Sequence, residues 1–179
     1  MDGKEIKLQN IHDRIYSHVA DTLKVYEVSI ESFASMLAAK PNSGFKNARK
    51  FARQLRNHYP DIYMFEIAKR IPHSERDDLE QKMQELGYKD YVLHSLGYSS
   101  DRQKHPLPVK EFYYPIVFIE PELEQSKGVL GLDLSEGNSV LSEGLIKSFN
   151  LNTHVASRPF LLMEGIYGYV LYREPESVT

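Results

Sequence analysis

The longest hydrophobic pattern in the chain lies near the N-terminus and has the spacing of a single helix face. Its apolar members recur every three or four residues, and they are Ile11, Ile15, Val19, Leu23, Tyr26, Ile30, Phe33 and Leu37. No Gly or Pro interrupts the chain from Ile6 to Lys40, and Pro41 then ends the pattern. A helix of this length spans roughly 50 Å, which is more than the width of a small domain. We therefore expect part of it to protrude, to pack on a second copy of the chain, or both.

Three shorter helices are predicted after this long one. They run from Asn42 or Ser43 to Tyr59, from Ser74 to Gly87, and from about Asn138 to Phe149. The first of them is stopped by Pro60. Ser74 with Asp77 three residues later resembles a capping box for the second. Ser135 is a candidate N-cap for the third.

Between the helices, short apolar segments have the character of β-strands. These segments are 62–68, 88–93, 112–119 and 129–134, and residues 155–163 and 167–172 read as a closing hairpin around 164–166. Residues 97–108 are rich in turn-forming side chains and are expected to be a loop. The pattern predicts an α+β fold, in which two helices (1–60) precede a region (61–175) with an antiparallel sheet of about five strands.

The composition narrows the possible functions. Lys and Arg number 22 against 25 Asp and Glu, a net charge of −3, so the chain lacks the basic excess of a protein that binds nucleic acid through bulk charge. Cysteine is absent, which excludes disulfides, thiol catalysis and Cys-ligated zinc. The seven His residues lack metal-ligand spacing, and we expect no metal or cofactor. No apolar run has the length of a membrane span or the character of a signal peptide, which by itself indicates a soluble cytoplasmic protein.

Two groups of charged residues have both a chemical and a structural interpretation. Glu120, Glu122 and Glu124 could hold a cation or form an acid/base pair, but alternating acids beside Pro121 are more typical of a solvated turn. The second helix carries the most basic stretch of the chain, which we expect to be a solvated helix face; its members are Lys46, Arg49, Lys50, Arg53 and Arg56. No motif of a catalytic nucleophile or a phosphate-binding loop is present, so no catalytic residue is predicted.

Asp133 is the most informative single residue. It alternates with Leu132 and Leu134, so its side chain leaves the strand on the face opposite to theirs. On a concave face it would be a partly buried carboxylate that needs a donor from the protein or a ligand; on an outer face it would meet solvent or cap the next helix. Both interpretations stay open. Arg70 and Arg76 could bind a ligand carboxylate, although structural ion pairs are the more common role.

Taken together, several segments in order resemble the CHASE domain family. Arg70-Ile71 with Glu75-Arg76 and Glu80 resembles one family element, and residues 111–121 (EFYYPIVFIEP) are similar to the family's E-Y-x-P-V-x-F-x-E-P strand. Residues 131–134 (GLDL) are similar to its G-x-D strand. Residues 157–162 (SRPFLL) with 168–172 (GYVLY) resemble its closing hairpin. Order and spacing hold from about Phe45 to Pro175.

The resemblance implies a sensory module and not an enzyme. CHASE domains lie outside the inner membrane between two transmembrane helices, and they control histidine kinases, diguanylate cyclases or adenylate cyclases. The implied fold is a stalk helix followed by PAS-like antiparallel sheets with flanking helices, so residues 61–175 become the sensor region. Residues 176–179 become a connection towards a membrane span beyond this sequence. The implied location is periplasmic or extracellular, which replaces the cytoplasmic interpretation.

The resemblance also implies candidate ligand-binding residues. In cytokinin receptors of plants, the best-understood branch, the G-x-D aspartate pairs with ligand N–H groups, and this role falls on Asp133. Other pocket positions fall on Ala156 and about Glu164, while Phe118, Leu162 and Val170 would supply apolar walls. Ala156 replaces a larger residue, and Arg173-Glu174 replaces an apolar pair. A polar or charged small molecule is therefore at least as compatible as a cytokinin, and Arg173 joins the candidate set.

Three functional hypotheses follow. In the first, ligand burial in the sheet favours one arrangement of long helices in a homodimer, through a difference in affinity of about 1–3 kcal/mol. In the second, the chain is a dimerisation and signal-relay module whose pocket is filled by its own side chains. A small hydrolase that uses the cluster from Glu120 to Glu124 is the weakest hypothesis, because the sequence offers no residue to orient those carboxylates.

Overall fold

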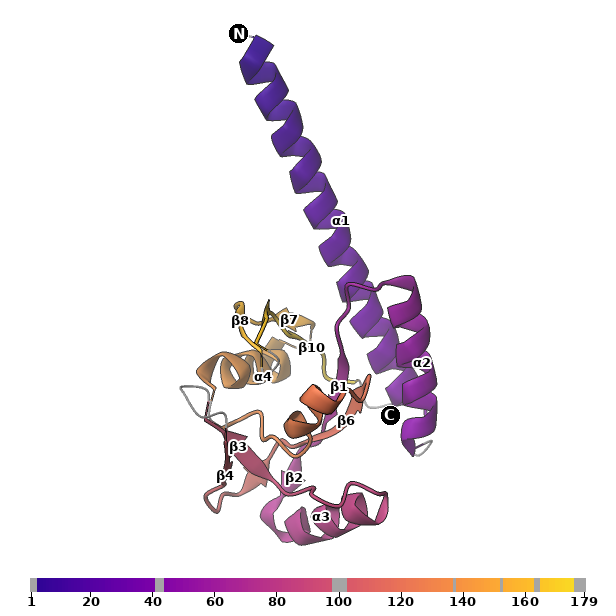
Figure 1. Ribbon diagram of the computed structural model, residues 1–179, viewed down its shortest axis with the longest axis vertical. Coiled ribbons are helices and arrows are strands. Elements are labelled where there is room, and N and C mark those ends of the chain that lie inside the picture. The colour runs from indigo at the N-terminus through magenta and orange to yellow at the C-terminus, as the bar shows by residue number, and fades with distance from the viewer. Residues whose placement is uncertain are drawn as a thin grey trace.

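The computed structural model describes residues 3–40, 44–97, 103–136, 138–151, 153–162 and 165–175, with the backbone alone for 3–6. It confirms the expected α+β class, with a long N-terminal helix, short antiparallel ladders and flanking helices. Figure 1 shows α1 extending far beyond the other elements, which gather around its C-terminal part. Within the residues just given, no helix combines the length and the apolar character needed to cross a membrane.

The two halves of α1 (Gly3–Ala39) differ in their surroundings. The helix has 37 residues, which corresponds to about 55 Å. Near its C-terminal end, Phe33 is buried together with Ala48 and Ala52 of α2 (Gly44–His58). In its N-terminal half the apolar stripe stays exposed, with exposed fractions between 43% and 74% for Leu8, Ile11, Ile15, Val19 and Leu23. The predicted long helix is therefore confirmed, and part of its apolar face has no cover within the described part of this chain.

The centre of the fold is β6 (Ile116–Glu120), a strand whose five residues are all buried. It pairs antiparallel with β1 (Phe65–Ala68), and the ladder continues through β5 (Phe112–Tyr113) and β2 (Ile71–Pro72). A second antiparallel ladder joins β3 (His94–Leu96) to β4 (Lys104–Pro106). The continuous apolar character of residues 112–119 thus predicted the central strand correctly.

Residues 131–134 connect these two ladders. On one side, the Gly131 amide donates to the Ile116 carbonyl (2.8 Å) and the Leu134 amide to the Tyr114 carbonyl (3.1 Å). On the other side, the His94 amide donates to the Gly131 carbonyl (3.0 Å), and the Asp133 amide donates to the His94 carbonyl (2.9 Å). Five segments therefore lie side by side, close to the expected number, but the pairing of His94 with Leu132 is parallel and not antiparallel.

Two strand predictions need correction around β3 and β4. The strand expected at 88–93 is absent, and β3 begins only at His94. Residues 88–91 instead form a turn against α3 (Arg76–Glu85), in which the Tyr88 amide donates to Met83 (3.2 Å) and the Tyr91 amide to Tyr88 (2.9 Å). The loop expected over 97–108 contains β4, whose exposed residues carry no apolar alternation. β4 is therefore a strand because it pairs with β3, and its own sequence carries no strand pattern.

Two capping predictions were also wrong. The Ser74 segment forms a short 3-10 helix, η1 (His73–Glu75), and the start of α3 at Glu75 has no side-chain cap, so the capping box is not formed. For α4 (Ser139–Leu151), the cap is the Asn138 side chain, which accepts from the Val140 amide at 2.9 Å. The expected cap, Ser135, contacts Asp133 instead.

The closing hairpin is confirmed. β7 (Val155–Ala156) pairs with β10 (Leu171–Tyr172), and β8 (Phe160–Leu161) pairs with β9 (Tyr167–Gly168). It packs on α4, where a Cβ at Gly144 would lie 2.5 Å from the Tyr172 ring. The last strand also contacts α1 and lies beside the C-terminal half of that helix, as Figure 1 shows.

Candidate functional site

The candidate site is built around Asp133, which lies at the centre of the sheet. The Gly131 backbone turns there with φ +87°, and a Cβ at that position would lie 2.2 Å from the Val92 carbonyl oxygen. Only glycine tolerates both the left-handed backbone and this close approach. The glycine of the G-x-D motif thus lets residues 131–134 pass close to the chain leading into β3, which places Asp133 between β3 and β6.

The Asp133 side chain is completely buried, so of the two interpretations that the sequence left open, the structure agrees with the inward-facing carboxylate. Its Oδ1 atom accepts three hydrogen bonds, from the Tyr114 amide (3.2 Å), the Ser135 amide (2.9 Å) and the Ser135 hydroxyl (2.7 Å). Its Oδ2 atom accepts no well-aligned hydrogen bond among the described residues and lies 2.9 Å from the Lys110 ammonium. One oxygen is therefore saturated by fixed groups, while the other depends on one flexible side chain.

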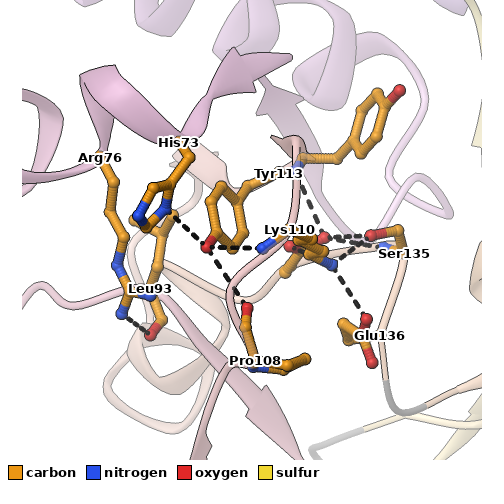
Figure 2. Close-up of polar contacts among 10 residues, drawn as sticks. His73, Arg76, Leu93, Pro108, Lys110, Tyr113, Ser135 and Glu136 are labelled. Atoms are coloured by element: carbon orange, nitrogen blue, oxygen red, sulfur yellow. Dashed lines mark hydrogen bonds and ion pairs between the residues drawn. The ribbon is translucent and has the colours of Figure 1, made fainter.

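Lys110 connects this carboxylate to the surface. Its ammonium group also donates to the Ser135 hydroxyl (2.8 Å) and to Glu136 (3.1 Å), and 21% of its side chain is exposed. Figure 2 shows these contacts converging on Lys110 between Ser135 and Glu136. No motif marks this residue, which lies in the loop before β5, so sequence reasoning did not identify it.

Tyr113 of β5 supports the loop that carries Lys110. Its hydroxyl lies 3.0 Å from His73 Nδ1 and 3.3 Å from the carbonyl oxygen of Pro108, and it accepts from the Lys110 amide at 3.3 Å. The ring is fully buried, with the Arg76 guanidinium 5.5 Å from its centroid. Figure 2 shows Tyr113 between His73 and the Lys110 loop. Tyr113 therefore fixes the backbone from which Lys110 reaches Asp133.

His94 is the buried neighbour of this site on β3. Its ring nitrogens face the carbonyl oxygens of Val92 (2.9 Å) and Gly128 (3.0 Å). Burial, the largest influence, lowers the pKa of His94, although both carbonyl contacts favour the charged ring. A neutral imidazole has one N–H and can satisfy one of these two carbonyls as a donor.

The other predicted ligand residues do not gather around Asp133. Phe118 is fully buried in the cluster between the sheet and α2, with the Phe45 ring 5.4 Å away. Ala156 is exposed on β7, and Val170 packs partly against the main core. Leu162 is half-buried beside Gly168, where a Cβ would lie 2.8 Å from its Cδ1 atom. Glu164 lies outside the described residues.

Arg173, the last predicted ligand residue, contacts α1. Its Nε atom donates to Glu31 at 2.8 Å, and only 9% of its side chain is exposed. In this arrangement the positive charge of Arg173 is paired with α1.

The acidic cluster after β6 required correction. Glu120 is not part of a solvated turn: it is 2% exposed and accepts from Arg49 (2.9 Å) and Arg53 (2.8 Å) of α2. Glu122 accepts from Arg49 and from the Tyr88 hydroxyl. Burial opposes the charge on Glu122, but these hydrogen bonds outweigh it and lower the pKa of its carboxyl. The expectation of a solvated basic face on α2 was therefore wrong for Arg49, whose side chain is 24% exposed, whereas Arg53 stays 62% exposed while it binds Glu120 at the end of the central strand.

The two remaining arginine candidates have structural partners. Arg76 donates to Glu80 at 3.1 Å, in the ion-pair role expected as the more common one. The guanidinium of Arg70 lies 3.7 Å from the centroid of the Phe112 ring, a cation–π contact that the sequence did not predict. Among the residues with described side chains, no three His, Asp or Glu gather in a way that could hold a metal ion.

Comparison with known protein families gives one clear finding. The model of the CHASE domain family matches residues 46–173, which include α2, the whole sheet, α4 and the closing hairpin. A search among curated proteins found no significant match. The family match covers most of the chain and includes Asp133, Lys110 and the surrounding sheet.

Proposed function

Because the chain belongs to the CHASE domain family, whose members are extracellular sensory domains of signalling proteins, we propose that it binds a small molecule at Asp133 and relays the event through a dimer of α1. The output would be a histidine kinase or a nucleotide cyclase on the other side of the membrane. The chain itself would act as a sensor, with its sheet region in the PAS-like role.

The observation that carries this proposal is the unequal pairing of the two Asp133 oxygens. Oδ1 is saturated by three donors from Tyr114 and Ser135, whereas Oδ2, among the described residues, faces only the Lys110 ammonium. A ligand with an ammonium, amidine or N–H group could take the place of Lys110 at Oδ2. The displaced Lys110 would keep Glu136, which already lies 3.1 Å away. A buried carboxylate that loses its cation needs such a replacement, because an unpaired buried charge is strongly unfavourable.

A physical path leads from this carboxylate to α1. Residues 131–134 bond to the chain at Tyr114 and Ile116, and β6 ends at Glu120. Arg49 and Arg53 bind Glu120 from α2, which packs on α1. A shift of residues 131–134 on ligand binding would therefore be transmitted by hydrogen bonds and ion pairs to the helix pair.

The dimer is supported by the exposed stripe on α1. Leu8, Ile11, Ile15, Val19 and Leu23 are 43–74% exposed, and they follow the spacing of one helix face. Full burial of such a side chain contributes about 1.5–3 kcal/mol, so covering this stripe with the same stripe of a second copy would give a stable interface. We propose a homodimer through this face.

The proposal is tested by a thermal-shift screen of amines, amidines and other N–H-rich metabolites. Ligands that stabilise the wild-type chain should give no stabilisation of Asp133→Asn, a variant that keeps the shape of the side chain but not its charge. Glu124→Gln is the matched control, since it removes an exposed carboxylate that pairs with Lys127 and not with Lys110, and it should respond like the wild type. Equal stabilisation of Asp133→Asn would contradict the role of Asp133.

A second candidate function is a ligand-free module for dimerisation and signal relay. The observation in its favour is that Lys110 already neutralises Asp133 from within the chain. A groove of about 180 Å³ lies elsewhere, between α1 and α2, and its lining includes Met36 and Phe51. A screen that finds no stabilising ligand, together with a stable dimer, would favour this alternative.

A further inference from the structure

A cluster of charged side chains joins α1 to the closing hairpin. Glu27 and Glu31 lie one turn apart on α1, and they face His154, just before β7, and Arg173, just after β10. His154 Nε2 lies 3.3 Å from Glu27 Oε1, and His154 Nδ1 lies 3.3 Å from Glu31 Oε1. Arg173 Nε lies 2.8 Å from the other oxygen of Glu31.

The strand register explains why the two basic residues meet. Val155 pairs with Tyr172 in the β7–β10 ladder, so His154 and Arg173 form the next opposite pair at its end. Two basic side chains are thus presented together to two acidic ones. Adjacent like charges on a helix face repel each other, and the hairpin supplies the cations that neutralise the acidic pair.

The charge of His154 decides how many of these contacts can form. A neutral imidazole carries one N–H, so it can donate to Glu27 or to Glu31 but not to both. A protonated imidazole donates from both nitrogens. We propose that this cluster is a proton-operated latch, closed between α1 and the closing hairpin when His154 is protonated and loosened when the ring is neutral.

Glu31 and two phenols near the latch keep the same charge state through neutral pH. Burial opposes ionisation of Glu31, but hydrogen bonds from Arg173 and His154 outweigh it and lower the pKa of this carboxyl. Two phenols also face the cluster. Desolvation and then Asp61 raise the pKa of Tyr26, and desolvation, then Tyr26 and Glu27, raise the pKa of Tyr169, so both stay neutral.

The direction of the pH effect follows from this arrangement. Histidine changes charge between about pH 5 and 8, and the side chain of His154 is 31% exposed, so protons from solvent can reach it. The closed latch is present at low pH and is lost as the pH rises. Arg173 keeps one permanent ion pair to Glu31, so the latch loosens without releasing the hairpin. An extracellular domain meets changes in external pH directly.

This inference rests on the proposed function only in that α1 carries the signal, and its test requires no ligand. Melting temperatures of the full chain are measured at about pH 5.5 and 8 for wild type, His154→Gln and His154→Arg. Wild type should exceed His154→Gln by about 2–4 °C at the lower pH and by less than half of that at the higher pH. His154→Arg, which is always charged, should differ from His154→Gln by the same amount at both pH values.

The matched control is His18→Gln, which replaces an exposed histidine of α1 outside the cluster and should keep the wild-type profile. An equal difference between wild type and His154→Gln at both pH values would overturn the latch.

A second measurement needs no change at His154. The chain has no cysteine, so Val28→Cys and Glu174→Cys provide two unique positions for spin labels on α1 and after β10. The distance distribution between the labels should broaden or shift between about pH 5.5 and 8. Adding His154→Arg should abolish this pH response. An unchanged distribution in the otherwise wild-type chain would overturn the latch even if the ligand site were confirmed.

Discussion

Replacing Lys110 by Met gives the sharpest test of the buried ion pair. Met keeps the length of the side chain but removes the ammonium that lies 2.9 Å from Asp133 Oδ2. Asp133 is fully buried, and removing one partner of a buried pair typically destabilises a protein by about 3–5 kcal/mol. Because Oδ1 keeps its three donors and Lys110 is partly exposed, we expect the lower end, about 3 kcal/mol. The exposed contact between Lys110 and Glu136 adds little.

The assay is urea denaturation at neutral pH, which gives the free energy of unfolding of each variant. Lys127→Met is the matched control, because Lys127 pairs with Glu124 at 2.7 Å on the surface, with side chains 53% and 86% exposed. Because this pair is exposed and screened by solvent, its loss should change stability far less than Lys110→Met does. Combining Lys110→Met with Asp133→Asn should destabilise less than the sum of the single variants. If Lys110→Met is no more destabilising than Lys127→Met, the buried pair does not contribute as argued.

Two further predictions concern the chain around Asp133. Gly131→Ala places a Cβ 2.2 Å from the Val92 carbonyl oxygen, so urea denaturation should show a free energy of unfolding lower by at least about 2 kcal/mol. Gly87→Ala is the control, since Gly87 also has a positive φ (+104°) but nothing lies within 4 Å of its Cβ, and it should lose clearly less stability. Equal losses in the two variants would contradict the close approach. Burial lowers the pKa of His94, although the carbonyls of Val92 and Gly128 favour its charged form. As the pH falls, the histidine is therefore protonated in the unfolded chain before it is protonated in the folded chain. The free energy of unfolding should thus fall as the pH drops below about 6.5. The stability difference between wild type and His94→Gln should shrink from about pH 7.5 to 5.5, and a constant difference would refute this assignment.

The sequence was most informative where a local pattern met no competition. The uninterrupted stripe from Ile11 to Leu37 predicted α1, and the apolar run at 112–119 predicted the central strand. The alternation around Asp133 raised the possibility of an inward-facing carboxylate, and Asp133 is buried. For the helix and the strand, local spacing and run length were enough to identify the element, while for Asp133 the alternation left the choice of face open.

The errors arose where the partner is distant in the chain. Glu120 looked like part of a solvated turn because its two arginines lie about seventy residues earlier, on α2. Lys110 had no signal of its own, since its role depends on residues 131–134 passing beside its loop. Similarly, β4 is a strand only because β3 lies next to it. Tertiary pairing of this kind is not encoded in local periodicity.

The same reasoning explains why the predicted ligand residues spread over the molecule. Their roles came from a family resemblance, residue by residue, and the structure places Phe118 against α2 and Arg173 against α1. Asp133 is the member that combines burial with an oxygen held by one movable cation. The ligand proposal therefore rests on Asp133 and Lys110, and not on the whole set.

The most direct test of the sensor proposal is to observe the Asp133 site while a ligand from the screen is added. In a ¹⁵N-labelled chain, the amides of Tyr114 and Ser135 report on this carboxylate, because both donate to its Oδ1 atom. The proposal predicts that a stabilising ligand shifts these two resonances in the wild type and not in Asp133→Asn. Ligand shifts confined to the groove residues around Phe51, with Tyr114 and Ser135 unchanged, would contradict it.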